Sequence, residues 1–178
     1  PIAEDKSSGS LYVLDASLNV GKKESNISVS NGLAWSQDHK TMYFIDSPTR
    51  KVVAYDYNKE SGELANKRTV ITIAEEDGFP DGMTIDNEGM LWIAHWGGWQ
   101  VARYDPGTGK KLLSISMPVS QVTSCAFGGE TMEDLYITSA RKGLSELELE
   151  KQPLAGSLFV VRNCGHKGLP AFQFKSIT

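Results

Sequence analysis

Two short motifs in this chain place an oxygen-bearing side chain directly before a glycine: Asn31–Gly32 and Asp81–Gly82. Amide and carboxylate oxygens suit a hard divalent cation such as Ca²⁺ or Mg²⁺, and they are also used by Mn²⁺ and Zn²⁺. Asn-Gly and Asp-Gly are equally the commonest dipeptides of tight turns, so each pair also has a purely structural explanation. The metal-ligand interpretation gains support because both pairs occur at the same point of a repeated pattern.

The repeated pattern consists of short runs rich in β-branched and aromatic residues, separated by polar turns. Its members are Asn31–Trp35, Met42–Asp46 and Val52–Asp56, then Asp81–Ile85, Leu91–Ala94 and Val101–Asp105, then Thr123–Phe127, Leu135–Thr138 and Ser157–Val161. The repeats begin roughly 40–50 residues apart, which is typical of β-propeller blades of four strands each. The innermost strand of each blade lines the channel, so Asn31, Asp81 and the Thr123–Ser124 pair are expected at the channel end.

The sequence therefore predicts one partial, all-β propeller domain over residues 1–178, with about three to three and a half blades. The blades are expected near 27–70, 78–116 and 119–174, and 9–16 is expected to be an outer strand whose partners lie outside the chain. Leu144–Lys151 is expected to form a loop with at most a short turn. A closed propeller has about 4–8 blades, so further blades are expected to complete the ring.

Composition excludes several classes of function. The net charge is −4 and the pI about 5.4, without a basic run, which argues against nucleic acid as a partner. The sequence contains no apolar stretch long enough to span a membrane. Two cysteines without metal-ligand spacing and the absence of an apolar leader at Pro1 favour a cytoplasmic protein.

Other catalytic patterns are missing. The chain has no His-Glu-x-x-His, Cys-x-x-Cys or Gly-x-Ser-x-Gly motif, and Gly107–Lys111 follows Asp105–Pro106 as a hairpin turn instead of a phosphate loop. His95 lies beside two tryptophans in a glycine-rich segment. It is either part of a blade-edge loop or a residue that lines a substrate pocket.

Three motif pairs resemble the regucalcin (senescence marker protein, SMP-30)/gluconolactonase/luciferin-regenerating enzyme family. They are Ser30–Ser36 with Met42–Ser47, Pro80–Asp86 with Leu91–Ala94, and Val122–Gly129 with Leu135–Ala140. The resemblance extends from about Gly9 to Gly168. It implies a six-bladed propeller whose N-terminal part is missing here. It also implies one divalent cation held by Asn31, by Asp81 and by a glutamate from the missing part, with Lys22 or Lys23 near the substrate.

The resemblance implies a metal-dependent lactonase. The cation would polarise the carbonyl of a small sugar lactone, while Asp81 would act as ligand and as general base. The alternatives are a non-catalytic calcium-binding regulatory protein, a small-molecule hydrolase of the luciferin-regenerating kind and, least favoured, a WD40- or kelch-type interaction propeller. Because a ligand is missing, the chain alone is expected to be inactive.

Overall fold

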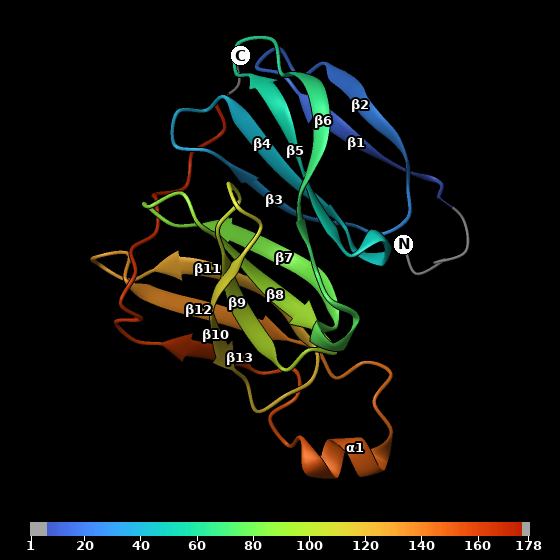
Figure 1. Ribbon diagram of the computed structural model, residues 1–178, viewed down its shortest axis with the longest axis vertical. Coiled ribbons are helices and arrows are strands. Elements are labelled where there is room, and N and C mark those ends of the chain that lie inside the picture. The colour runs from blue at the N-terminus through green and yellow to red at the C-terminus, as the bar shows by residue number, and fades with distance from the viewer. Residues whose placement is uncertain (1–6, 176–178) are drawn as a thin grey trace.

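The computed structural model describes residues 7–175 and is built almost wholly from antiparallel β-sheet (Figure 1). A two-stranded sheet pairs β1 (Gly9–Leu14) with β2 (Val20–Ile27). The next two sheets have four strands each: β3 (Ser30–Trp35), β4 (Thr41–Asp46), β5 (Lys51–Asn58) and β6 (Glu63–Thr72), then β7 (Phe79–Ile85), β8 (Leu91–Trp96), β9 (Gln100–Tyr104) and β10 (Lys111–Ser116). The last sheet contains β11 (Val122–Gly128), β12 (Asp134–Ser139) and β13 (Leu158–Val161).

In each sheet the strands follow one another in chain order, and the sheets pack face to face as successive blades of a partial propeller (Figure 1). The first strands of the larger sheets lie side by side, β3 against β7 and β7 against β11. The predicted all-β class and the inner position of the motif-bearing strands agree with this arrangement. The expectation of six blades stays a prediction.

The core lies in the layers between neighbouring sheets. β8 is buried from Leu91 to His95, because neighbouring sheets cover both of its faces. A strand that is buried on both faces needs apolar side chains throughout, and His95 is the exception. By contrast, β10 alternates between half-buried and exposed side chains, as expected for an outer strand with one face in solvent. The blade stacking therefore fixes the position of the inner strands from both sides.

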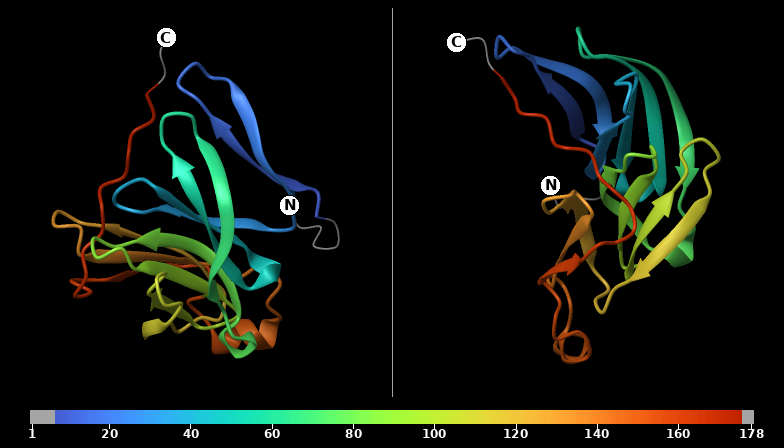
Figure 2. Two further views of the ribbon diagram at one scale, coloured as in Figure 1. Left: turned by 45° about the horizontal axis from the view of Figure 1, so that its top comes forward. Right: turned by 90° about the vertical axis from the view of Figure 1, so that its left-hand side faces the viewer.

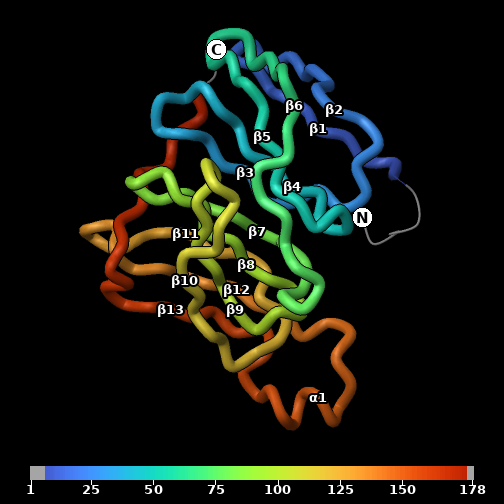
Figure 3. Tube along the Cα trace, viewed as in Figure 1, coloured from blue at the N-terminus to red at the C-terminus, as the bar shows by residue number. Residues whose placement is uncertain are grey.

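Three features of the structure differ from the sequence prediction. The strand expected at 9–16 does have a partner within the chain, because β1 pairs with β2 from Gly9↔Ile27 to Leu14↔Val20. The last sheet has three strands instead of the expected four. The segment 144–151, expected to be a loop, contains the short helix α1 (Glu146–Lys151), which projects from the sheets between β12 and β13 (Figure 3).

After β13 the chain turns back and runs across the ends of the neighbouring sheets (Figure 2). The backbone N–H of Asn87 donates to Lys167 O at 2.8 Å, and that of Gly168 donates to Met132 O at 2.8 Å. Leu169 then packs against the core layer between the two four-stranded sheets. Within 7–175, no helix has the length and hydropathy needed to cross a bilayer.

Candidate functional site

Asn31 and Asp81 lie near the starts of β3 and β7, which are neighbouring strands. Both side chains are half-buried, and the Asn31 side chain is close enough to the Asp81 carboxylate to lower its pKa. Nδ2 of Asn31 also lies 2.9 Å from Ser47 Oγ, to which it donates. The fold thus brings together the two residues predicted to bind the cation, although 50 positions separate them in the chain.

The glycines after these residues allow the inner strands to approach closely. A Cβ at Gly32 would lie 2.5 Å from Met83 Cβ and 2.9 Å from Asp81 O, and one at Gly82 would lie 2.3 Å from Ser124 Oγ. Neither glycine is among the residues with positive φ. Glycine is therefore needed at both positions because a side chain would not fit, and not because the backbone adopts a turn conformation. The tight-turn explanation of the two dipeptides is wrong.

Burial raises the pKa of Asp81 to about 6, although hydrogen bonds from Asn31 and from the Gly82 backbone act in the opposite direction. Among residues 7–175, Asp81 has no ion pair with a lysine or arginine that would offset the burial of its charge. Asp81 is thus a half-buried carboxylate without a cationic partner in that range, and the Asn31 side chain beside it carries an amide oxygen. Such a pair suits a bound cation. The residues present therefore fit a divalent metal, although they supply only part of its ligands.

The turn after β4 supports Asn31 and was not identified from the sequence. Asp46 accepts hydrogen bonds from the backbone N–H groups of Ser28 (3.2 Å) and Val29 (2.7 Å), which fixes the chain just before Asn31. The following Ser47 is buried and holds the Asn31 amide. An Asp-Ser pair at a strand end is a common capping sequence, so nothing in it specifies this longer-range role.

On the third inner strand, the hydroxyl groups have other partners. Thr123 Oγ1 lies 2.7 Å from Thr138 Oγ1 on β12, and Ser124 packs beneath Gly82. This strand therefore contributes close packing to the site.

The side chains of the three residues predicted near the substrate contact groups other than Asn31 and Asp81. Lys22 and Lys23 are on β2, where Lys22 Nζ lies 5.9 Å from the centroid of the Tyr12 ring and Lys23 pairs with Glu63. These contacts are to β1 of the first sheet and β6 of the second, and the role of the two lysines near the substrate stays a prediction.

His95 also differs from its prediction. It has 0% exposure on β8, and its ring nitrogens lie 2.9 Å from Asp77 O and 3.3 Å from Tyr104 Oη. Burial lowers its pKa, although the Asp77 carbonyl acts in the opposite direction. A side chain without exposed surface cannot line a substrate pocket, so the pocket interpretation is wrong and His95 is part of the blade interior.

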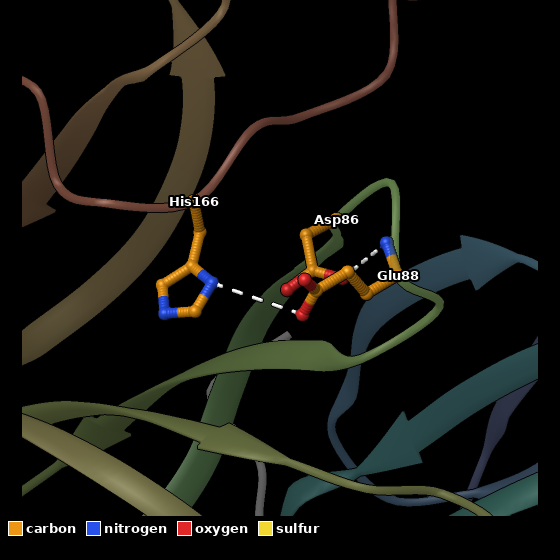
Figure 4. A group of neighbouring side chains, drawn as sticks. All are labelled: Asp86, Glu88 and His166. Carbon is orange, nitrogen blue, oxygen red and sulfur yellow. Dashed lines mark hydrogen bonds and ion pairs between the residues drawn. The ribbon is translucent and has the colours of Figure 1, made fainter.

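A second group of possible ligands, Asp86, Glu88 and His166, lies near the opposite end of β7 (Figure 4). Asp86 is fully buried, and Oδ2 accepts hydrogen bonds from Trp92 Nε1 (2.9 Å) and Arg103 Nε (2.7 Å). Its Oδ1 accepts two backbone N–H groups of the turn. Since the Arg103 guanidinium already pairs with both Asp86 and Glu88, and the Glu88 side chain is largely exposed, this group is explained as a structural ion-pair network.

A groove of about 850 Å³ lies between β3, the end of β7 and the C-terminal segment, with Leu33, Trp35 and Phe172 among its walls. It contacts β7 at Thr84 and Ile85, at the other end of the strand from Asp81. The groove is therefore separate from the Asn31–Asp81 pair.

Comparison with known proteins agrees with this geometry. Residues 1–141 match the family described as "SMP-30/Gluconolactonase/LRE-like region". Regucalcin of Sus scrofa is 43% identical over 174 residues, which cover 98% of this chain and 58% of the relative. The chain thus spans little more than half the length of this relative.

Two solved structures have the same fold over nearly the whole chain. A luciferin-regenerating enzyme superimposes with a TM-score of 0.86 at 40% identity, covering 95% of this chain and 55% of that one. A regucalcin from Agrobacterium tumefaciens, described as a calcium-binding protein, gives a TM-score of 0.86 at 29% identity, covering 98% and 57%. The motifs, the stacked sheets and these similarities together show that the chain belongs to the SMP-30/gluconolactonase/luciferin-regenerating enzyme family.

Proposed function

We propose that this chain is the ligand-bearing part of a divalent-metal-dependent hydrolase that opens a small sugar lactone. The observation that carries the proposal is the Asn31–Asp81 pair, in which a half-buried carboxylate without a cationic partner in 7–175 lies beside an amide. Membership of a family whose name includes gluconolactonases supports lactone opening as the reaction.

In this proposal each residue has a distinct role. Asp81 supplies negative charge to the cation and accepts a proton at a carboxylate oxygen. A bound cation would lower its pKa below the value of about 6 that burial gives the carboxyl without metal. Asn31 is a neutral ligand whose amide is oriented by Ser47. When bound, the cation (Ca²⁺, Zn²⁺, Mn²⁺ or Mg²⁺) would polarise the lactone carbonyl.

The ligand set of this chain is incomplete for such an ion. Ca²⁺ usually takes about 6–8 oxygen ligands and Zn²⁺ about four, so two side chains leave several positions for other groups and water. We infer that the remaining protein ligand and the substrate contacts come from blades present in the longer relatives. The partner of this chain is then those N-terminal blades, and the chain alone is inactive.

The test measures D-glucono-δ-lactone opening with a pH indicator in the presence of Ca²⁺, Mn²⁺ or Zn²⁺. It compares the chain with a form extended to the length of its relatives. Asp81→Asn in the extended form is expected to lower metal-dependent turnover at least about 100-fold, because loss of a group that merely supports a ligand already costs about 10–100-fold. Glu60→Gln, an exposed acid in the β5–β6 turn, serves as the control and should retain full activity.

A second candidate function uses the same residues without catalysis. A related structure is described as a calcium-binding protein, which favours a binding or regulatory role for the same pair. Tight, Asp81-dependent Ca²⁺ binding without turnover in the extended form would support this alternative and overturn the lactonase proposal. Turnover of another small ester but not of the lactone would favour the luciferin-regenerating kind of hydrolase.

A further inference from the structure

Arg50 lies at the start of β5 with an unusual backbone conformation. It follows the 3₁₀ turn η1 (Ser47–Thr49), has φ 53°, and its N–H donates to Ser47 O at 3.0 Å. A left-handed conformation is unfavourable for a residue with a Cβ, and glycine or asparagine adopts it more readily. An arginine at this position is therefore explained best by what its side chain contacts.

The Arg50 side chain crosses from its own sheet to the next one. Its Nη1 donates to Glu75 O at 3.2 Å and to Gly78 O, which belong to the turn η2 (Glu75–Asp77) and to the residue that follows it. The guanidinium also lies over the Phe79 ring, 3.9 Å from its centroid. Phe79 begins β7, two residues before Asp81, so Arg50 holds the segment that leads directly to this carboxylate.

The turn that contains Arg50 also holds the other ligand strand. Ser47, at the start of η1, accepts a hydrogen bond from Asn31 Nδ2 at 2.9 Å, and its N–H donates to Val29 O at 3.1 Å. One short turn therefore contacts β3 through Ser47 and β7 through Arg50. The backbone carbonyl of Arg50 adds a further link, since it accepts a hydrogen bond from Ile73 N at 2.8 Å.

The contacts indicate that Arg50 acts through geometry. The two carbonyls and the aromatic ring need a planar guanidinium with several donors, which a lysine cannot replace.

We propose that Arg50 is a positioning residue that sets the separation of Asn31 and Asp81 by joining η1 to the segment before Asp81. This inference rests on the proposed metal site. Loss of Arg50 should loosen the ligand geometry while both ligands remain. Removal of a group that hydrogen-bonds a metal ligand typically weakens metal binding about 10–100-fold, and Arg50 acts one contact further out, so the lower end of that range is expected.

The test uses Mn²⁺ alone as the probe, on the intact protein in the form that contains all metal ligands. Mn²⁺ affinity is measured by titration calorimetry, and the geometry of the bound ion by the line shape of its electron paramagnetic resonance spectrum. Arg50→Ala is expected to weaken binding about 10-fold and to broaden the spectrum. Arg50→Lys should give nearly the same loss, because it keeps the charge but not the planar group. Arg68→Ala is the matched control, since Arg68 lies on β6 of the same sheet and pairs with Asp56.

Hydrogen exchange without metal separates a local effect from unfolding. Arg50→Ala should speed exchange at residues 75–82 and leave β8 and β12 protected. One outcome would overturn the positioning role and leave the metal site standing. In it, Arg50→Ala binds Mn²⁺ with normal affinity and an unchanged spectrum, while Asp81→Asn no longer binds Mn²⁺. Absence of Mn²⁺ binding by the unsubstituted protein would overturn the metal site and this inference together. A uniform loss of protection throughout the variant would show a general folding role and would also overturn it.

Discussion

At the residue scale, the meaning of a short motif depends on what surrounds it. Asn31–Gly32 and Asp81–Gly82 have the composition of turns, yet both are in strands and their glycines face neighbouring strands at distances that exclude a Cβ. Asp86 and Glu88 have the composition of a metal site, yet Arg103 already pairs with both. The distinction rests on whether a cationic side chain compensates the buried carboxylate, as Arg103 does for Asp86.

The Asp86 network leads to a prediction about pH. Burial raises the pKa of Asp86, but hydrogen bonds from Arg103, Trp92 and the Met90 N–H outweigh it and hold the pKa below its usual range. Because the folded pKa lies below the unfolded value of about 3.9, the stabilisation is complete above that value. It is lost as the pH falls through the folded pKa. Asp86→Asn should lower the free energy of unfolding at pH 7 by about 3 kcal/mol.

Urea unfolding at pH 7 and in the acid range checks this expectation. The difference in the free energy of unfolding between the unsubstituted chain and Asp86→Asn should shrink steadily as the pH falls below about 4. In that range the Asp86 carboxylate of the unfolded chain becomes protonated first, and that of the folded chain follows at lower pH. Glu60→Gln, an exposed acid, should stay within about 0.5 kcal/mol of the unsubstituted chain at every pH. A difference that does not depend on pH would show that Asp86 acts through shape and not through charge.

At the element scale, the segment after β13 extends the packing beyond the sheets. Gly168 is buried, and a Cβ there would lie 2.1 Å from Phe127 Cβ, closer than any real contact. Its backbone forms an isolated β-bridge with Asp86, which follows β7 of the second four-stranded sheet. Its N–H donates a hydrogen bond to the carbonyl of Met132, near the last sheet. This segment therefore joins two blades through its backbone, at the end of the strands opposite to Asp81.

Gly168→Ala is expected to destabilise the chain by about 1–3 kcal/mol, because an added methyl group must displace Phe127 or the segment itself. Thermal unfolding measures the effect, and Lys167→Ala is the control because that side chain is exposed while only its carbonyl is used. In a chain that already carries Phe127→Ala, the further substitution Gly168→Ala should cause little additional destabilisation, as expected for residues in direct contact. Additive losses would show that Phe127 does not limit the space.

At the scale of the whole molecule, the sheets at both ends of the stack have an edge strand without a second partner among residues 7–175. In that range β1 pairs only with β2, and β13 only with β12. Leu158 and Val160 of β13 are 66% and 40% exposed. Unpaired edges with exposed apolar side chains promote strand pairing between molecules, so this chain on its own should self-associate as its concentration rises.

Leu158→Lys should reduce this association, since a lysine on an edge strand opposes edge-to-edge pairing. Light scattering coupled to size exclusion, over a range of concentrations, measures the mean mass. Leu147→Lys is the matched control, because Leu147 is 69% exposed but lies on helix α1. Equal effects of the two substitutions would point to general hydrophobicity instead of the strand edge, and a monomer at all concentrations would contradict the prediction.

The sequence by itself determined the all-β class, the inner strands and the two candidate ligands, because strand alternation and a repeated register are local properties of the chain. It misjudged the partner of β1, since β2 has few apolar residues and its pairing depends on backbone hydrogen bonds. It also missed α1, whose six residues depend on the Ser145 capping box instead of an apolar stripe.

Only the tertiary structure decided what each polar residue does. His95 is a candidate site residue in the sequence, and Asp86 belongs to a group of possible metal ligands in the structure, yet blade packing buries both and supplies their hydrogen-bond partners. Ser47 and Arg50 look ordinary, yet their contacts join the strands that carry Asn31 and Asp81 across a blade boundary. Such roles depend on distances between residues far apart in the chain, and those distances are set by how the sheets stack.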